Sequence, residues 1–246
     1  MRKLIINADD FGDAPFTRGI LEARTNGPLT SATVLVNTEG AEDAIASAKK
    51  HSLPLGLHLN FTHGAPLSGG EPFFGRITFR QALEEGRMDS AEITKEAEAQ
   101  LAWFTERIGT PTHIDGHHHV HILRPVLDVL APLMVKKGVE RMRIPYGIPG
   151  AQEAKAICDA HGIRTNDHFI GLDFGWEKCT PQRLEEELRG LPEGVTEYMV
   201  HLAHPEDIGE GAETAGRTQE FTTLTHPRIM EVIREEGIEL VSYADL

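Results

Sequence analysis

The sequence predicts an α/β fold in which parallel strands alternate with helices and close into a (β/α) barrel, complete or distorted. Two observations predict it. About eight apolar, strand-like runs alternate along the 246 residues with segments of helical spacing, and neither a repeat nor a low-complexity linker interrupts them. Alternation of this kind is typical of a parallel sheet with helices outside. The count of about eight and the chain length favour a barrel, so we expect one domain spanning residues 1–246.

The first half of the chain alternates as this fold requires. Strands are expected at residues 4–6, 31–36, 55–61 and 112–121, and helices at 16–26, 41–51 and 90–108. The strands are short apolar runs, and Gly27-Pro28 ends the first helix. Apolar residues at helical spacing mark the third helix, namely Ile93, Ala97, Leu101 and Phe104. Ser90 is expected to cap it only in part, because Ile93 rather than Glu stands three residues later.

The second half continues the pattern. Strands are expected at residues 141–145, 167–171, 198–205 and 239–242, and helices at 125–137, 152–161, 181–188 and 227–236. Gly138 and Gly237 end two of these helices, and Pro181 begins another. Between the third strand and the third helix, residues 63–75 are rich in Gly and Pro, so a long loop that could cover a site is expected there.

Charge and composition exclude several function classes. The formal net charge of −14 argues against nucleic acid and anionic membranes as partners. No apolar run approaches the roughly 18 residues of a membrane span, and the N-terminal residues lack a signal-peptide pattern. Cys158 and Cys179 form no C-x-x-C pair and fit a reducing compartment. A cytoplasmic protein is therefore expected, with outer helices that could serve a homo-oligomer.

The stretch from Thr112 to His121 is the strongest functional signal. It holds five of the 13 histidines and one aspartate within ten residues. Neutral imidazole and carboxylate are preferred ligands of zinc, manganese, iron and related divalent ions. A solvated polar loop is the alternative interpretation. Because Pro111 and Ile114 give the stretch the character of a short buried strand, a metal site at a strand end is favoured.

Ionisable residues follow five of the eight expected strands. In a parallel barrel all strand C-terminal ends meet on one face. The residues at these ends are Asp9 and Asp10, His58, Asp115 with His117 to His121, Arg143, and His201 with His204. Each has an ordinary alternative: a capping carboxylate pair, a core histidine, a structural ion pair or a turn residue. Buried charges are costly unless paired or metal-bound, so their joint placement predicts a metal site.

The same motifs resemble the YdjC-like carbohydrate deacetylase family. They are N-A-D-D-F-G at residues 7–12, G-L-H-L at 56–59, T-H-I-D-G-H-H-H-V-H at 112–121 and H-P at 204–205. The resemblance implies a barrel related to that of the polysaccharide deacetylases. It also implies metal-dependent removal of acetyl groups from N-acetylated sugars, such as chitooligosaccharides.

The resemblance also implies residue roles. Asp10, His58 and His117 match the metal ligands. Asp9 matches the general base and His204 the general acid, with Asp115 and Arg143 in support; the roles of the adjacent Asp9 and Asp10 could be exchanged. The family implies magnesium, whereas two histidines and a carboxylate also suit zinc or another transition metal. Residues 63–89 match no motif, so the resemblance does not identify the particular sugar.

Two other functions remain open. One is a different metallohydrolase on the same barrel, such as a phosphoesterase or an amidohydrolase-like deaminase; these enzymes usually carry H-x-H on the first strand, where this chain has Asp9 and Asp10. The other is a non-catalytic protein that binds sugar or stores metal. A relative acting on a lipid-linked N-acetyl sugar is a third possibility. Release of acetate, rather than phosphate or ammonia, would separate the hydrolases.

Overall fold

Parallel strands form one sheet of nine strands in the computed structural model, which describes residues 1–13, 15–73, 75–171, 179–207 and 212–246. The strand order is β6-β5-β4-β3-β2-β1-β8-β7, and β9 pairs with the first residues of β1. The strands are β1 (Arg2–Phe11), β2 (Ser31–Val34), β3 (Leu55–Leu59), β4 (Ile114–Gly116), β5 (Arg141–Met142), β6 (Arg164–Thr165), β7 (His168–Ile170), β8 (Gly194–Val200) and β9 (Glu239–Leu240).

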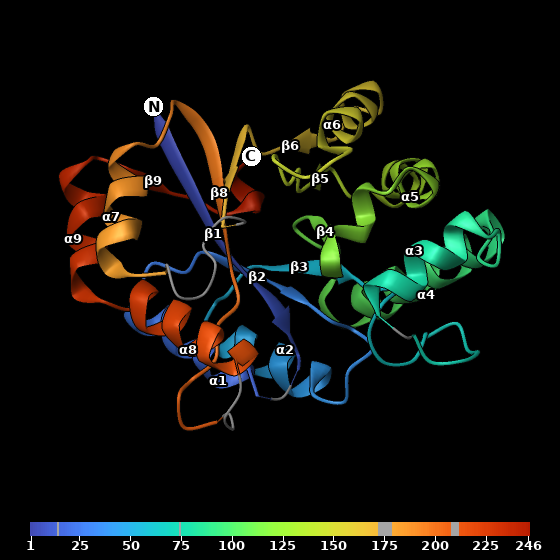
Figure 1. Cartoon of the computed structure of the whole chain (residues 1–246), viewed down its shortest axis with the longest axis horizontal. Helices are drawn as coiled ribbons and strands as arrows, with labels where there is room; N and C mark the ends of the chain where they lie inside the picture. Colours follow the sequence, from blue (N-terminus) through green and yellow to red (C-terminus); the bar gives the residue numbers. More distant parts are fainter. Residues whose placement is uncertain (14, 74, 172–178, 208–211) are drawn as a thin grey trace.

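Helices surround this sheet (Figure 1). They are α1 (Thr17–Asn26), α2 (Ala41–Lys50), α3 (Arg76–Glu84), α4 (Ser90–Ile108), α5 (Arg124–Lys137), α6 (Ala151–Ala160), α7 (Pro181–Arg189), α8 (Ala212–Leu224) and α9 (Pro227–Glu235). Two short 3₁₀ helices, η1 (His117–Ile122) and η3 (Tyr243–Asp245), follow β4 and β9. The strand order has two ends, β6 and β7, so strand pairing does not close the barrel among the described residues. The fold is therefore a distorted (β/α) barrel, which confirms the predicted fold class.

Several predicted elements differ in extent from those observed. Helices α3 and α8 were not predicted; α3 buries only Phe79, so its apolar periodicity is weak. The eighth strand begins at Gly194 and ends at Val200, which is earlier than predicted. The cap of α4 is also corrected, because Asp89 rather than Ser90 accepts the N–H groups and forms a full capping box with Glu92.

The two faces of the sheet differ in polarity. On β1, alternate residues enter the main apolar core under the helices, namely Leu4, Ile6 and Ala8. Ile5 instead contacts Val241 and Tyr243 in a separate small cluster. Successive strand residues point to opposite faces, so Ile5, Asn7 and Asp9 face into the barrel. The same alternation turns polar residues of the other strands inward, and the barrel interior is therefore largely polar.

The predicted loop at residues 63–75 contains neither helix nor strand in its described part. It is held in place by buried polar side chains. Glu96 of α4 accepts the backbone N–H groups of Leu67 and Ser68, at 3.0 and 2.7 Å. Asn37 donates to the carbonyl oxygens of His63 and Ala65. The loop therefore has a defined path beside the end of β3.

None of the helices in the described part of the chain combines the length and hydrophobicity that a membrane-spanning helix needs.

Candidate active site

Asp9 and Asp10 both face one cavity although they are neighbours on a strand. The register of β1 against β2 shifts between Ala8 and Phe11, and Asp10 has a φ of 61°. Left-handed backbone is uncommon outside glycine and its strain is often found at functional sites. This irregularity lets the two consecutive carboxylates line the same cavity.

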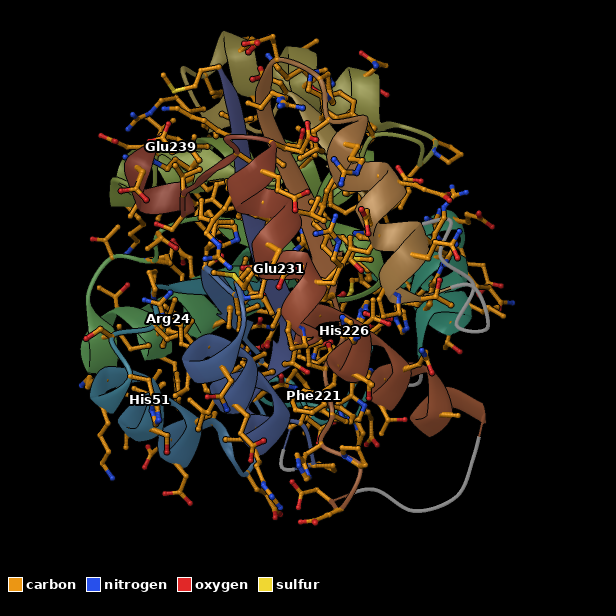
Figure 2. All side chains as sticks on the ribbon, turned by 90° about the vertical axis from the view of Figure 1, so that its left-hand side faces the viewer. Arg24, His51, Phe221, His226, Glu231 and Glu239 are labelled. Atoms are coloured by element: carbon orange, nitrogen blue, oxygen red, sulfur yellow. The ribbon has the colours of Figure 1, made fainter. Side chains whose placement is uncertain are left out.

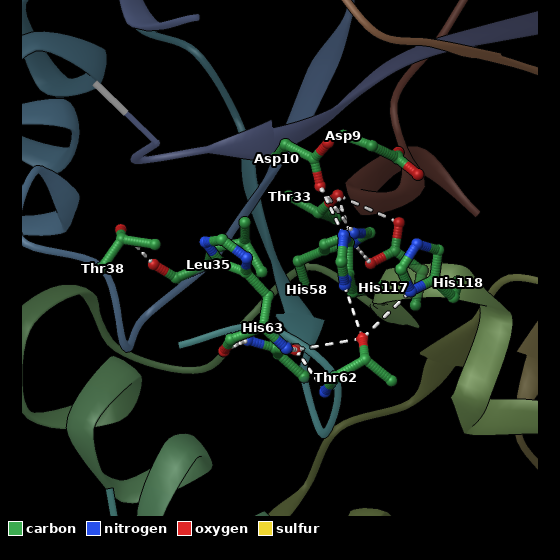
Figure 3. Close-up of polar contacts among 12 residues, drawn as sticks. Asp9, Asp10, Thr33, Leu35, Thr38, His58, Thr62, His63, His117 and His118 are labelled. Atoms are coloured by element: carbon green, nitrogen blue, oxygen red, sulfur yellow. Dashed lines mark hydrogen bonds and ion pairs between the residues drawn. The ribbon is translucent and has the colours of Figure 1, made fainter. Parts of the chain in front are cut away.

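Asp10, His58 and His117 converge on one point (Figure 3). Oδ1 of Asp10 lies 3.3 Å from Nε2 of His58 and 3.8 Å from Nε2 of His117. This oxygen is buried, and among the described residues it accepts no hydrogen bond. The other oxygen, Oδ2, accepts a hydrogen bond from Arg217 of α8 at 2.7 Å. Three donor atoms of the predicted types therefore surround a position that fits a cation.

Each of the two histidines is oriented by a partner on its other ring nitrogen. His58 Nδ1 donates to Asp115 Oδ1 at 2.7 Å, and Asp115 Oδ2 accepts the Thr33 hydroxyl at 3.0 Å. His117 Nδ1 lies 2.6 Å from the Thr62 hydroxyl. Metal-binding histidines usually have such a partner, which fixes the ring and the tautomer. Both Nε2 atoms are thereby directed at Asp10.

A second group of side chains also has the composition of a metal site. One ligand atom from each of Asp9, His58 and Asp115 lies within 4.8 Å of the others, and all three residues are buried. However, both oxygens of Asp9 and one of Asp115 already contact the Arg143 guanidinium at 2.7–2.8 Å. A cation held there would lie against a positive charge. Asp10 also contacts an arginine, Arg217, but only through Oδ2. Its Oδ1 accepts no hydrogen bond from the described residues, so the Asp10 group fits a divalent ion better.

Arg143 is the largest fully buried side chain in the described part of the chain. Its guanidinium makes five contacts of 2.7–2.9 Å, two with Asp9, one with Asp115 and two with Glu197. Four of these contacts are hydrogen bonds, and the contact with Asp115 is an ion pair. Four of the five N–H groups of the guanidinium are therefore used. The structure thus places Arg143 as the arginine that holds the Asp9 carboxylate.

Local charges and burial shift the pKa values of Asp9, His58 and His117 in different directions. Burial alone would raise the pKa of Asp9, but Arg143 and His58 hold it below its usual range. Burial alone would lower the pKa of His58, but Asp115, Asp9 and Asp10 raise it to about 10. Burial lowers the pKa of His117 to about 3. The position between the carboxylates of Asp9, Asp10 and Asp115 thus favours a positive charge. A divalent ion can provide this charge, and so can a proton.

The cavity has a volume of about 300 Å³. Its lining includes Asp9, Asp10, His58 and His117, together with His201 and Glu220. His201 directly follows β8, and its backbone N–H donates to Glu220 of α8 at 2.7 Å. An imidazole from the end of β8 therefore lines the same cavity as the two carboxylates.

The structure brings together six of the seven predicted site residues. Asp9, Asp10, His58, Asp115, His117 and Arg143 lie in one connected group. His204 does not join them. Its ring lies 3.4 Å from an Arg18 nitrogen and 3.5 Å from a Glu22 oxygen of α1. The sequence interpretation extended the strand to residue 205, whereas β8 ends at Val200, so His201 is the histidine at the strand end.

The histidines after β4 follow an unusual backbone. The predicted strand to residue 121 ends at Gly116, and residues 117–122 form η1. His118 and His119 have φ values of 55° and 56°, in the strained left-handed region. His117 thus stands at the junction between the strand end and this turn, and it lies beside Asp10 rather than in an extended strand.

Comparisons with known proteins agree with this geometry. The family described as YdjC-like protein matches residues 3–235. The chain is 36% identical to a carbohydrate deacetylase of Brevibacillus brevis, over 99% of both chains. It is 33% identical to a chitooligosaccharide deacetylase of Klebsiella pneumoniae, over 100% of this chain and 99% of the relative.

Solved structures share the fold. An Enterococcus faecalis V583 protein, whose name refers to cellobiose-phosphate cleavage, is 28% identical with a TM-score of 0.85, over 99% of this chain and 98% of that one. A family 4 carbohydrate esterase from Streptomyces lividans, crystallised with acetate, has a TM-score of 0.52 at 13% identity, over 98% of this chain and 91% of that one. The second likeness shows the fold alone.

Proposed function

The chain belongs to the YdjC-like protein family, and on this premise we propose that it is a metal-dependent hydrolase that removes acetyl groups from N-acetylated sugars. Its relatives named carbohydrate deacetylase and chitooligosaccharide deacetylase support this reaction and make chitooligosaccharides the first substrates to test. The observation that carries the proposal is the group of Asp10, His58 and His117 around one buried carboxylate oxygen that accepts no hydrogen bond from the described residues.

Asp10, His58 and His117 would hold the divalent ion. When bound, such an ion polarises a carbonyl group and lowers the pKa of water towards about 7. The family resemblance favours magnesium, while two imidazoles and one carboxylate suit zinc or another transition metal. Asp115 and Thr62 support the site by orienting the two imidazole rings.

Asp9 is proposed as the general base. Arg143 keeps its carboxylate ionised and directed into the cavity by two hydrogen bonds of 2.7 Å. A strongly paired carboxylate is a weak base towards free water. However, the attacking water becomes far more acidic as its oxygen bonds to the acetyl carbon, and Asp9 then accepts its proton. General-base assistance of this type contributes roughly 10²–10⁴-fold in rate.

His201 is proposed as the general acid, the role expected for His204 from the sequence. It lines the same cavity as Asp9 and Asp10, whereas His204 contacts α1 residues. As the C–N bond breaks, the sugar nitrogen takes a proton from His201. The products are acetate and the sugar with a free amine, so atoms and charges balance.

The proposal is tested with purified protein stripped of metal and then loaded separately with Mg²⁺, Mn²⁺, Co²⁺ or Zn²⁺. Each form is incubated with N-acetylglucosamine and with chitooligosaccharides of two to six units, and free acetate is measured. We expect acetate only from metal-loaded protein, and only where the three proposed metal ligands are intact. Asp10→Asn should lose metal binding and acetate release, while Asp128→Asn, an exposed carboxylate on α5, serves as the matched control.

Three results would overturn it. Acetate release at the same rate from metal-free protein would remove the metal from the reaction. Release of phosphate or ammonia from phosphorylated or aminated test compounds, with no acetate from any acetylated sugar, would favour another metallohydrolase. Sugar binding with no release of any product would favour a non-catalytic sugar-binding protein.

A further inference from the structure

We propose that Glu197 and Tyr243 are positioning residues that hold Asp9 in place through Arg143, from the interior of the barrel. The inference rests on the proposed deacetylation. Neither residue lines the cavity at Asp10. Their effect on the reaction must therefore pass through Arg143.

The contacts form a continuous chain between the C-terminal segment and the general base. The Tyr243 hydroxyl donates to Oε2 of Glu197 at 2.5 Å. Oε1 of Glu197 accepts hydrogen bonds from Nε and Nη2 of Arg143, at 2.9 and 2.7 Å. Arg143 then donates to both oxygens of Asp9. All four side chains are buried, with exposed fractions of 0–2%, so water cannot readily replace a lost partner.

Glu197 determines how the guanidinium is oriented. Asp9 accepts from Nη1 and Nη2 of Arg143, Asp115 contacts Nη1, and Glu197 alone contacts Nε among the described residues. A planar guanidinium is aligned when acceptors bind more than one of its edges. Without the contact between Nε and Glu197, the guanidinium of Arg143 could rotate between Asp9 and Asp115. The bidentate pair with Asp9 would then lose its fixed direction.

Tyr243 determines how Glu197 is oriented. Its hydroxyl contacts Oε2, the carboxylate oxygen that Arg143 does not use. The ring is held independently of this bond, because it stacks on His113 with centroids 3.8 Å apart and also contacts Ile5. The His113 ring in turn fits beside Gly56, where a Cβ would lie 2.5 Å from it. Removal of the hydroxyl alone should therefore leave the ring in place.

Tyr243 lies far from Asp9 along β1, although we expect it to affect the reaction. It contacts Ile5, four residues before Asp9 on the inward face of β1, or about 13 Å along the strand. The segment that follows β9 thus supports the active site from the side of the barrel remote from the cavity.

The experiment compares Tyr243→Phe with Tyr198→Phe. Tyr198 is equally buried on β8, but it belongs to the apolar core under the helices, and its hydroxyl lies 3.9 Å from Cys179 Sγ. Both variants lose one buried hydroxyl. For Tyr243→Phe we expect kcat to fall about tenfold or more, because small misplacements of catalytic groups have large effects on rate. KM and the metal Kd should stay within about twofold of wild type, as expected for an interaction that matters only in the transition state.

Tyr198→Phe should keep the wild-type kcat although its unfolding free energy also falls. Equal kcat losses in both variants would assign the effect to general destabilisation and overturn the proposal. An unchanged kcat in Tyr243→Phe would also overturn it.

Glu197→Gln gives a second test. Combined with Tyr243→Phe, it should lower kcat no further than the stronger single variant, because both substitutions act through Arg143. Additive losses would contradict the chain of contacts.

Failure of the proposed function can be told apart from failure of this inference. If wild type releases no acetate from any substrate, the proposed function fails, and a crystal structure of Tyr243→Phe still decides the inference. A guanidinium of Arg143 that has moved away from Asp9 would support it. A bidentate Arg143–Asp9 pair unchanged from wild type would overturn it.

Discussion

An arginine that contacts three carboxylates occurs both inside the barrel and on its surface, and the two settings can be compared at Arg143 and Arg228. Inside, Arg143 contacts Asp9, Asp115 and Glu197, and all are buried. On the surface, Arg228 of α9 contacts Glu185 of α7 and Glu231 and Glu235 of its own helix. Figure 2 shows the outer face of the molecule that carries α9 and Glu231.

The difference between the clusters lies in their surroundings rather than in their partners. Around Arg228 water can replace any carboxylate, so each ion pair contributes little and is weakened by salt. Arg143 and its three partners are buried, so each unpaired charge would be strongly unfavourable. The interior cluster can therefore fix the direction of Asp9, whereas the surface cluster joins two helices without defining any one geometry.

The largest effect is expected from Arg143→Met. The substitution keeps a long side chain but leaves three buried carboxylates without their cation, and we expect a loss of about 3–5 kcal/mol in unfolding free energy. Acetate release should also disappear. Urea unfolding at neutral pH measures the first effect. The matched surface variant, Arg228→Met, should change stability far less, and equal losses would contradict the comparison.

Asp9→Asn separates catalysis from metal binding. We expect turnover to fall roughly 10²–10⁴-fold because the general base is lost, while the metal Kd stays close to that of wild type because Asp10, His58 and His117 are intact. Acetate assays and metal titration calorimetry measure the two quantities. On the surface, Glu185→Gln should leave turnover unchanged. Loss of metal binding in Asp9→Asn would instead favour the Asp9, His58 and Asp115 group as the metal site.

Metal binding should stabilise the barrel interior and not the surface cluster. At a free metal concentration a hundredfold above Kd, binding adds about 2.7 kcal/mol to the stability of the folded state. We therefore expect a chelator to lower the Tm of wild type. His117→Gln should abolish the difference between the two conditions, while His161→Gln, an exposed histidine at the end of α6, should keep it. A Tm that metal leaves unchanged in wild type would count against the site.

The smallest effect is expected from pH and salt at the surface cluster. Hydrogen bonds from Arg228 and Arg189 lower the pKa of Glu185 from 4.5 to about 2. Because the folded pKa is the lower one, the stabilisation is present above pH 4.5 and disappears as the pH falls towards 2. The Tm difference between wild type and Glu185→Gln should therefore shrink over this range, and it should shrink in high salt. A difference independent of both would show that the charges are not its cause.

Much of the fold was predictable because local periodicity reflects burial. Apolar runs and helix-ending glycines located β1, β2 and β3 and most of the helices within a few residues. The exceptions follow from the same rule. Helix α3 buries one residue and β6 has two residues, so their patterns are too weak or too short to detect. Strands were predicted at β5 and β9, but they are shorter than expected, with two residues each. The N-cap of α4 was also misplaced by one residue.

Most of the candidate site residues could be predicted from their places at strand ends, because a parallel topology brings those ends together. Six residues from four distant segments, Asp9 and Asp10, His58, Asp115 and His117, and Arg143, were identified in this way. The end of the eighth strand was placed five residues too late. The resemblance implies His204 as the general acid, whereas we propose His201, which directly follows Val200 and lines the cavity. The extent of a strand decides which side chain reaches the cavity, because the chain leaves the sheet directly after the last paired residue.

The chain's local pattern was sufficient to establish a parallel barrel, its polar strand ends and the types of ligand they offer, because these depend on residue type and spacing. It could not reveal that Asp10 turns through a left-handed backbone to meet two imidazoles while Asp9 meets Arg143. Nor could it reveal that Tyr243 supports that arginine through Glu197. These arrangements join residues up to 234 positions apart, and each depends on packing in a buried space that no single segment creates.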